Sequence, residues 1–563
     1  MKTQGMAHQL EGLRLSNGRE FFAYLMEQGT GKTWTTLADA ERAYAAGTID
    51  ALCVIAPKGV HTNWTRREIP EHLSCEWTGG AYESGAGKRA RAALENALFR
   101  VRDEGEVPPL RVLTINIDAL LGDEGFTLVT RFINATRCML VVDESSDIKN
   151  PDAARTKRIM RLKPRTVMRR ILNGTPITNS PGDAFAQFEF LEDGLLGTTS
   201  YRAFYAEYTD LIPMNDQRLK AEGNWGMAQR LQRNPKLKYA QVPRRDESGA
   251  PMYRNLDKLQ GLVKKHSYRV LKKECLDLPE KIYQTIFFEM EPAQRRAYES
   301  VQEDARLEFD DETITFSPLA VLTKMQQVTS GFVMVEGEPV MLPNSPGAKV
   351  RLAALMRAVE HANGKMIIWA KFREELAQIA AALTEAEISF VEYHGGVKRD
   401  MREIAVDEFQ RGEARVFLGQ PRAGGIGLTL TAAETMIYYS NDFNLRTRLQ
   451  SEDRAHRIGT KVNVVYIDLV ATGTIDESIA RALQRKTAVA QQILGDTGLK
   501  FNEEDLARNE DDVVLVGSVQ EARAAGDDAV VVLDPPVAAS FIDQNDAASS
   551  LQEWTVASTR TRR

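Results

Sequence analysis

Short apolar runs recur in two parts of the chain, and most of them are separated by stretches with helical periodicity. A run of this kind between polar residues is typical of a strand that is buried on both faces. The pattern predicts strands at Phe21–Met26, Ala51–Ala56, Arg111–Ile115, Cys138–Val142, Val167–Leu172, Lys365–Trp369, Ser389–Tyr393, Ala414–Leu418, Thr435–Tyr439 and Val462–Leu469. Amphipathic stretches between them, such as 35–46, 373–383 and 400–410, predict helices. Because strands alternate with helices in both parts, we expect an α/β protein with two parallel sheets.

The two series of strands divide the chain into four segments. We expect one α/β domain at residues 1–195 and a second at residues 346–498. Residues 196–345 are expected to form a mainly helical, basic insert that continues neither sheet. Residues 499–563 are rich in Ala, Val and Asp, and we expect an acidic accessory tail or a small module there. A small β module, a DNA-mimicking inhibitor and a poorly ordered tail all fit its composition.

Length and composition agree with this division. A chain of 563 residues exceeds the roughly 250–300 residues beyond which one core stops growing. Hydrophobic residues make up 43% and charged residues 27%, which excludes a disordered, collagen-like or membrane class for the whole chain. The start, MKTQGMAHQLEG, lacks the apolar core of a signal peptide. The four cysteines are far apart without a CxxC pair, so we expect no zinc site, no disulfides and a reducing, cytoplasmic location.

The net charge of −6 argues against a nucleic-acid partner only until it is divided along the chain. Residues 501–563 carry 13 acidic and 5 basic side chains, a net charge of −8, whereas residues 1–500 sum to +2. Between Leu211 and Lys273 there are 15 basic and 5 acidic side chains with tyrosines and a tryptophan among them. This stretch is either a surface that follows nucleic acid or a solvated helical surface.

A phosphate-binding loop is predicted directly after the first strand. The residues Gly29-Thr30-Gly31-Lys32-Thr33 precede the helical stretch 35–46. Glycines at the start of a helix let backbone N–H groups surround phosphate oxygens. Lys32 would then reach the β- and γ-phosphates of ATP, and Thr33 would bind Mg²⁺. Met26 replaces the first glycine of the usual pattern, and a glycine-rich helix start without a ligand is the alternative.

An acidic pair follows a later strand of the same domain. Asp143 and Glu144 come directly after the apolar run 138–142, at the strand end where ligands bind in open α/β sheets. We expect Asp143 to hold Mg²⁺ and Glu144 to polarise the attacking water.

These two motifs, together with others in the same order, resemble helicase superfamily 2, and within it the SWI/SNF-like ATPases. The resemblance runs from about His8 to Leu494. It implies two tandem RecA-like lobes, a nucleotide-reading Gln9, contacts of Lys58, Asn63, Trp64 and Asn116 with DNA, and a coupling role for Gly174, Thr175, Pro176 and Asn179. The departures from the family pattern include Ser146, where relatives often have His or Gln, and Asn173 before Gly174.

The second domain carries the most specific part of the resemblance. Residues 422–430, RAGGIGLTL, are similar to the fifth motif of the family, which implies DNA contacts for Arg422, Gly424, Gly425 and Thr429. Residues 450–459, QSEDRAHRIG, resemble its sixth motif, which implies catalytic roles for Gln450, Arg454 and Arg457. Arg454 and Arg457 are three residues apart and would share one face of a helix. One or both would act as arginine fingers on the γ-phosphate.

The resemblance implies an ATP-dependent translocase that moves along double-stranded DNA and needs Mg²⁺. A strand-separating DNA or RNA helicase is a second hypothesis, which an unwinding assay beside a triplex-displacement assay separates from the first. A non-catalytic DNA-binding scaffold is a third hypothesis, and it requires that no nucleic acid elicits ATP hydrolysis. The visible motifs predict no membrane partner and do not indicate a protein partner.

Overall fold

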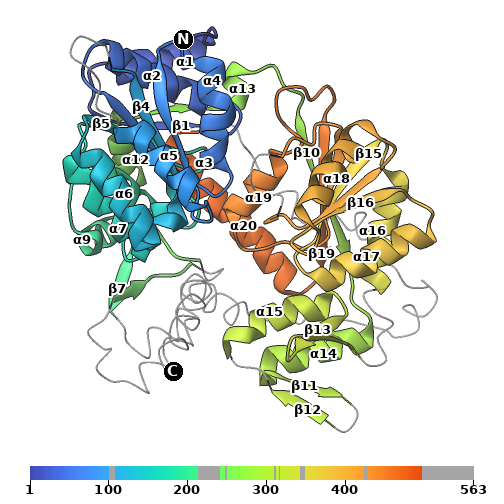
Figure 1. The fold of residues 1–563 in the computed structure, drawn as a ribbon. Coiled ribbons are helices and arrows are strands. Elements are labelled where there is room, and N and C mark those ends of the chain that lie inside the picture. The colour runs from blue at the N-terminus through green and yellow to red at the C-terminus, as the bar shows by residue number, and fades with distance from the viewer. Residues whose placement is uncertain are drawn as a thin grey trace, which may run out of the picture. The chain divides into compact units, whose positions relative to one another are not determined.

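The computed structural model describes residues 1–99, 108–213, 241–246, 250–309, 312–315, 318–342, 349–423 and 428–496 (Figure 1). These residues form two compact units. Unit 1 contains Met1–Thr209, Tyr253–Leu278 and the segment that begins at Lys486, and unit 2 contains Asp210–Met252 and Pro279–Arg485, both within the described ranges. The predicted insert is therefore divided between the two units.

Unit 1 is built on a parallel sheet of seven strands in the order β3-β4-β2-β5-β6-β1-β9. The strands are β1 (Phe21–Met26), β2 (Ala51–Ala56), β3 (Trp77–Tyr82), β4 (Leu110–Asn116), β5 (Cys138–Asp143), β6 (Met168–Leu172) and β9 (Ser267–Val270). Five of these strands are those predicted for the first domain. Alternate side chains of β5 enter two separate apolar cores, Leu140 and Val142 on one face and Met139 and Val141 on the other. The strands are apolar on both faces because both faces are covered.

Helices cover this sheet and connect its strands. They are α1 (Ala7–Ser16), α2 (Lys32–Ala45), α3 (Val60–Asn63), α4 (Ile69–His72), α5 (Lys88–Phe99), α6 (Asp123–Asn134), α7 (Ala154–Leu162), α8 (Asp183–Leu191), α9 (Tyr201–Tyr208), α12 (Leu256–Lys265) and α13 (Lys272–Cys275). The last helix of the described chain, α20 (Ile475–Leu494), begins in unit 2 and ends in unit 1. Its Ile493 is completely buried in the core of unit 1.

Unit 2 has a parallel sheet of six strands in the order β10-β19-β18-β15-β17-β16. The strands are β10 (Lys281–Phe288), β15 (Lys365–Trp369), β16 (Phe390–Tyr393), β17 (Val416–Gly419), β18 (Ala433–Tyr438) and β19 (Val464–Ala471). The helices of this unit are α14 (Pro292–Asp304), α15 (Pro318–Thr329), α16 (Lys349–His361), α17 (Arg373–Glu385), α18 (Arg399–Arg411) and α19 (Leu445–Glu452). The α/β class with two parallel sheets is confirmed.

The expectation that residues 196–345 continue neither sheet is wrong. β9 pairs with β1 at the edge of the first sheet, and β10 pairs with β19 at the edge of the second. The described residues of this region also form three antiparallel strand pairs, β7 (Leu211–Pro213) with β8 (Gln241–Pro243), β11 (Arg306–Phe309) with β12 (Glu312–Thr315), and β13 (Phe332–Val335) with β14 (Glu338–Met341). Part of the basic stretch and the acidic tail from residue 499 lie outside the described residues. In the described part of the chain, no helix is both long and apolar enough to cross a membrane.

Candidate active site

The predicted phosphate loop joins the end of β1 to the start of α2. Gly29 and Gly31 have φ angles of 87° and 88°, a left-handed conformation that glycine adopts readily. A Cβ atom on Gly31 would lie 1.9 Å from Nε2 of Gln9, so the loop can approach α1 this closely only with glycine there. Lys32, the first residue of α2, donates to the carbonyl oxygens of Met26 at 3.1 Å and Glu27 at 3.4 Å. The loop thus combines a helix N-terminus and an ammonium group, which both attract phosphate oxygens. Thr33 follows on α2 and is partly buried.

The N-terminal helix α1 is attached to this loop by two side chains. Nε2 of His8 and Nε2 of Gln9 both donate to the carbonyl oxygen of Thr30, at 2.8 and 3.3 Å. The amide N–H of Met6 donates to Oε1 of Gln9 at 2.8 Å. Gln9, the predicted nucleotide-reading residue, therefore lies buried beside the phosphate loop.

The predicted acidic pair lies at the carboxyl end of β5, two strands from β1. Asp143 is buried. Its burial and, to a smaller extent, the nearby charge of Glu144 raise its pKa to about 6, although the Lys32 ammonium acts in the opposite direction. Glu144 has a φ angle of 54°, which turns the chain directly after the strand. Its amide N–H donates to Oδ1 of Asp143 at 3.0 Å. A cation bound beside this buried carboxylate would favour its ionised form.

Trp64 is not placed to contact DNA, and this part of the prediction is wrong. The side chain is only 1% exposed, and its indole N–H donates to Oδ2 of Asp143 at 3.1 Å. The reason is the burial of Asp143, because a buried carboxylate needs hydrogen-bond donors that water cannot supply. Trp64 is thus part of the Asp143 site.

Three other residues predicted to contact DNA follow the ends of β2 and β4, which are paired in the sheet. Lys58 and Asn63 are exposed, and Asn63 donates to Glu68 at 3.1 Å. Asn116 is partly exposed and accepts a hydrogen bond from the amide N–H of Asp118 at 3.0 Å. All three lie at the carboxyl edge of the sheet, which is also the edge of the phosphate loop and of Asp143.

The predicted coupling turn, Gly174–Asn179, follows β6 at the same edge. A Cβ atom on Gly174 would lie 3.0 Å from the amide nitrogen of Gln28, so the turn packs directly on the phosphate loop. Before the turn, Nδ2 of Asn173 donates to Oγ of Ser145 at 3.3 Å, and Ser145 donates to Oε1 of Gln187 at 2.6 Å. Gln187 in turn donates to the carbonyl oxygen of Pro176 at 2.7 Å. Buried hydrogen bonds therefore connect the segment after Glu144 with the turn. Asn173, which departs from the family pattern, is thus a partner of Ser145 in this network.

The far end of the turn is held by Asp183, which sequence reasoning missed. Its Oδ2 accepts from the amide N–H groups of Thr178 and Asn179 at 2.9 and 2.8 Å and from the Thr178 hydroxyl at 3.0 Å. Lys149 also lies 3.4 Å from this oxygen. The sequence contains a signal for this role, because Asp183 begins the apolar helix α8 directly after a Pro-Gly pair.

The fifth-motif residues of unit 2 are described only in part. Gly424 and Gly425 lie outside the described residues. The Arg422 side chain is 72% exposed and pairs with Asp442 at 2.7 Å. Thr429 is exposed, and its hydroxyl accepts from Nη1 of Arg457 at 3.0 Å.

The sixth motif is not helical throughout, so the prediction that Arg454 and Arg457 share a helix face is wrong. Helix α19 carries Gln450, which is partly buried, and ends at Glu452. The chain then turns, and the carbonyl oxygen of Arg454 accepts from the amide N–H of Leu430 at 2.9 Å. The Arg454 side chain is completely buried within unit 2. Arg457 is partly exposed, and burial lowers the pKa of its guanidinium.

A buried ionic cluster holds α19 and the sixth motif on the second sheet, and no sequence motif predicted it. Arg448 pairs with Asp468 of β19 and, at 2.8 Å, with Glu452. Its guanidinium lies 3.6 Å from the ring centroid of Tyr438 on β18. Burial by itself would raise the pKa of Glu452, but the nearby Lys281 and Arg448 lower it. The start of the sixth motif is therefore fixed to two strands.

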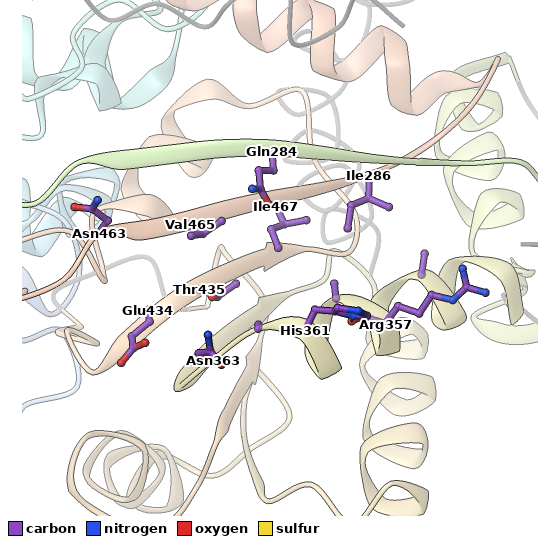
Figure 2. Close-up of a pocket in the computed structure, with 13 residues that line it drawn as sticks. Gln284, Ile286, Arg357, His361, Asn363, Glu434, Thr435, Asn463, Val465 and Ile467 are labelled. Carbon is purple, nitrogen blue, oxygen red and sulfur yellow. The ribbon is translucent and has the colours of Figure 1, made fainter. Parts of the chain in front are cut away.

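Unit 2 also has a pocket of about 600 Å³, which lies away from these motifs (Figure 2). It is bounded on one side by α16, which contributes Arg357 and His361. The other side includes Glu434 and Thr435 near the start of β18 and Asn463 just before β19. None of the predicted site residues lines it. Ligands of open parallel sheets bind at the opposite, carboxyl edge.

The fold and these motifs define a nucleotide-binding α/β protein with two parallel-sheet units. Residues 25–330 match the SNF2-related domain, and residues 350–459 match the helicase conserved C-terminal domain. The chain therefore belongs to the SNF2-related family of helicase-like superfamily 2 ATPases.

Similar proteins occur in eukaryotes and bacteria. The DNA repair and recombination protein RDH54 of Saccharomyces cerevisiae is 26% identical over 394 residues, which cover 65% of this chain and 40% of that protein. The chromodomain-helicase-DNA-binding protein 1-like of Mus musculus is 24% identical over 482 residues, which cover 83% of this chain and 47% of that protein. The putative ATP-dependent helicase/translocase YwqA of Bacillus subtilis is 26% identical over 367 residues, which cover 63% of this chain and 35% of that protein.

The chain spans less than half the length of these relatives. Among solved structures, the SWI2/SNF2 ATPase core of Sulfolobus solfataricus in complex with dsDNA is similar at a TM-score of 0.37 and 20% identity, covering 88% of this chain and 94% of that one.

Proposed function

We propose that this protein is an ATP-dependent DNA translocase, which uses ATP hydrolysis to move along double-stranded DNA and to remodel DNA structures or protein–DNA complexes. The observation that carries the proposal is the contact between the phosphate loop and the coupling turn at one sheet edge. Gly174 packs on Gln28, and Asn173 is hydrogen-bonded to the segment that follows Glu144. A change at the phosphates would thus reach the turn through direct contacts. The names of two relatives, which mention DNA repair and DNA binding, support the choice of DNA.

The residues of unit 1 fit a nucleotide with Mg²⁺. Lys32 would bind the β- and γ-phosphate oxygens. Gln9, which is buried beside the phosphate loop, would contact the base. Thr33 and Asp143 would hold the metal ion, and the Trp64 indole would keep one Asp143 oxygen in place. Mg²⁺, when bound, neutralises part of the charge on the phosphates. Glu144 would accept a proton from the attacking water.

In unit 2, we assign to Arg457 the role of stabilising the negative charge that develops on the γ-phosphate. A planar guanidinium donates two hydrogen bonds to phosphate oxygens, which suits it to this role. Its partners Thr429 and Leu428 belong to the fifth motif. The buried Arg454 would have a structural role. DNA phosphates would be contacted by the exposed Lys58, Asn63, Arg422 and Thr429, with Asn116 nearby.

ATP hydrolysis measured with duplex DNA, forked DNA, single-stranded DNA and RNA tests the proposal, together with triplex displacement and strand unwinding. We expect stimulation by duplex DNA and triplex displacement without unwinding. Unwinding of a duplex would favour a strand-separating helicase, and preferential stimulation by RNA would favour an RNA-dependent enzyme. Absence of hydrolysis with every nucleic acid would favour the DNA-binding scaffold.

Glu144→Gln keeps the size of the side chain but removes the proton acceptor. We expect ATP hydrolysis to fall by at least about 10²-fold while DNA binding stays within about twofold, and Lys32→Ala should also abolish hydrolysis. A DNA-stimulated ATPase assay and fluorescence anisotropy with labelled duplex measure the two quantities. Glu95→Gln is the control, because Glu95 is 48% exposed and pairs with Arg131 on the surface. Near-normal hydrolysis by Glu144→Gln would remove the assigned site.

A further inference from the structure

Arg269 of β9 binds three separate segments of unit 1. Its Nη1 donates to the carbonyl oxygen of Leu25 at 3.0 Å and to that of Gly174 at 2.8 Å. Its Nε and Nη2 donate to the two carboxylate oxygens of Asp496 at 2.9 and 2.7 Å. Leu25 belongs to the strand that leads into the phosphate loop, and Gly174 begins the coupling turn. One guanidinium therefore joins the two parts of the site whose contact the proposed function requires.

Asp496 comes from the opposite end of the described chain, directly after α20. Gly495 has a φ angle of 73°, and the amide N–H of Asp496 donates to the carbonyl oxygen of Gln491 at 3.0 Å. The Asp496 side chain is 5% exposed and that of Arg269 is 17% exposed. A bidentate pair fixes the plane of the guanidinium, so Asp496 decides where the remaining donors of Arg269 point.

The same segment also reaches the other end of the coupling turn. Nζ of Lys486 on α20 donates to Oδ1 of Asn179 at 3.0 Å. Ile493, between Lys486 and Asp496, is completely buried in the core of unit 1. Gly174 and Asn179, the first and last residues of the turn, thus each contact a side chain whose position depends on the docked end of α20.

We propose that Arg269 is a positioning residue for ATP hydrolysis and that Asp496 is the counter-ion that orients it. Together with Lys486, they make the docked segment 486–496 a clamp on the coupling turn. The inference rests on the proposed function and adds to it that segment 486–496, far along the chain, fixes the position of the coupling turn. A lysine at position 269 would supply charge but could not bind two carbonyl groups and a carboxylate in one plane.

Hydrogen exchange and ATPase kinetics of the full-length protein test the clamp. The variants are Arg269→Ala, Arg269→Lys, Asp496→Asn and the double variant Arg269→Ala/Asp496→Asn. Arg254→Ala is the matched control, because Arg254 lies on the same segment of unit 1 and also binds two backbone carbonyl oxygens, of Ala206 at 2.6 Å and Glu207 at 3.3 Å, away from the site. Exchange is compared between the amides of residues 173–180 and those of the internal strand β4.

In Arg269→Ala we expect exchange at residues 173–180 to accelerate by about tenfold or more, with that of β4 unchanged. The DNA-stimulated kcat should fall by about tenfold, with KM for ATP and Kd for DNA within about twofold. Arg269→Lys should recover only part of kcat. The kcat of Asp496→Asn should lie between those of the wild type and Arg269→Ala. The kcat of the double variant should be no lower than that of Arg269→Ala, because both residues act through one contact.

The inference is overturned if Arg269→Ala matches Arg254→Ala in exchange at residues 173–180 and in kcat, or if exchange rises equally in β4. It is also overturned if Arg269→Lys restores full activity, since charge alone would then suffice. If the wild type hydrolyses no ATP with any nucleic acid, the proposed function fails. The exchange at residues 173–180 still decides the clamp in that case.

Discussion

The surroundings of Asp143 show how one carboxylate depends on residues from distant segments. Burial and Glu144 raise its pKa, whereas Lys32 and the indole N–H of Trp64 lower it. A metal ion binds the ionised carboxylate, so the neutral Trp64 N–H, which favours ionisation, also favours metal binding. Trp64 is therefore expected to act on the metal site without contacting the nucleotide.

Trp64→Phe removes the indole N–H and keeps an aromatic ring in the core. We expect the Mg²⁺ concentration for half-maximal ATP hydrolysis to rise by about threefold to tenfold, as for the loss of one hydrogen bond of roughly 1 kcal/mol. Titration of hydrolysis and of fluorescent-nucleotide binding with Mg²⁺ measures the change. Trp369→Phe is the control, because Trp369 is also fully buried but its indole nitrogen has no hydrogen-bond partner among the described residues. An unchanged Mg²⁺ requirement in Trp64→Phe would show that the bond is incidental.

Sequence motifs predicted which residues of the site meet, but not which side chains are buried. Gly31, Lys32, Asp143 and Gly174 lie at one sheet edge as expected, because each follows or ends a strand of the same parallel sheet. The resemblance to the family assigned Trp64 to DNA, together with Lys58 and Asn63 of the same motif. Only its contact with Asp143, across 79 positions of sequence, reveals that it points inward. Arg269 also acts through long-range contacts that no local spacing encodes.

At the scale of elements, the unpredicted strands of the two large sheets are edge strands. β3 and β9 are the two edges of the first sheet, and β10 is an edge of the second. An internal strand is covered on both sides and shows a continuous apolar run, whereas β10 alternates between partly buried and exposed side chains over most of its length. β3 contains two glycines, and β9 has four residues. Hydrophobic pattern therefore predicted the interior of each sheet better than its borders.

Helix α8 depends on Asp183 at its first position, where the carboxylate holds the end of the coupling turn. Asp183→Ala leaves the buried amide N–H of Thr178 and the partly buried amide N–H of Asn179 without their acceptor, which costs about 1–3 kcal/mol. We expect a lower urea midpoint for unfolding, measured by circular dichroism, and a reduced DNA-stimulated kcat, measured in an ATPase assay. Asp123 also begins a helix, α6, but its side chain is 92% exposed, so Asp123→Ala should change neither quantity appreciably. Equal effects of the two substitutions would argue against a role of Asp183 in the turn.

For the whole molecule, the net charge conceals an uneven distribution. Residues 1–500 sum to +2, and the 13 acidic and 5 basic side chains of residues 501–563 bring the total to −6. Surface charges act on DNA within about 10 Å at 0.1 M salt, so the tail is expected to weaken DNA binding wherever it comes near the exposed basic residues.

Removal of residues 501–563 tests this electrostatic effect. We expect duplex DNA to bind about threefold to tenfold more tightly at 50 mM salt, and the difference to disappear at 0.5 M salt, where charges are screened. Fluorescence anisotropy at both salt concentrations measures it, and the high-salt comparison is the control. Equal affinities at low salt would show that the tail stays away from the DNA-binding surface.

The passage of α20 from unit 2 into unit 1 has a consequence for the order in which the protein forms on the ribosome. The first unit lacks Ile493 and Asp496 until almost all described residues have been made. After Leu278, about 200 further residues must be synthesised before Lys486 emerges, which takes on the order of 10–40 s at typical elongation rates. During that interval the coupling turn has neither Arg269 oriented by Asp496 nor Lys486 beside Asn179. A nascent chain can therefore fold its phosphate loop early, but it completes its clamp only after the second unit has been translated.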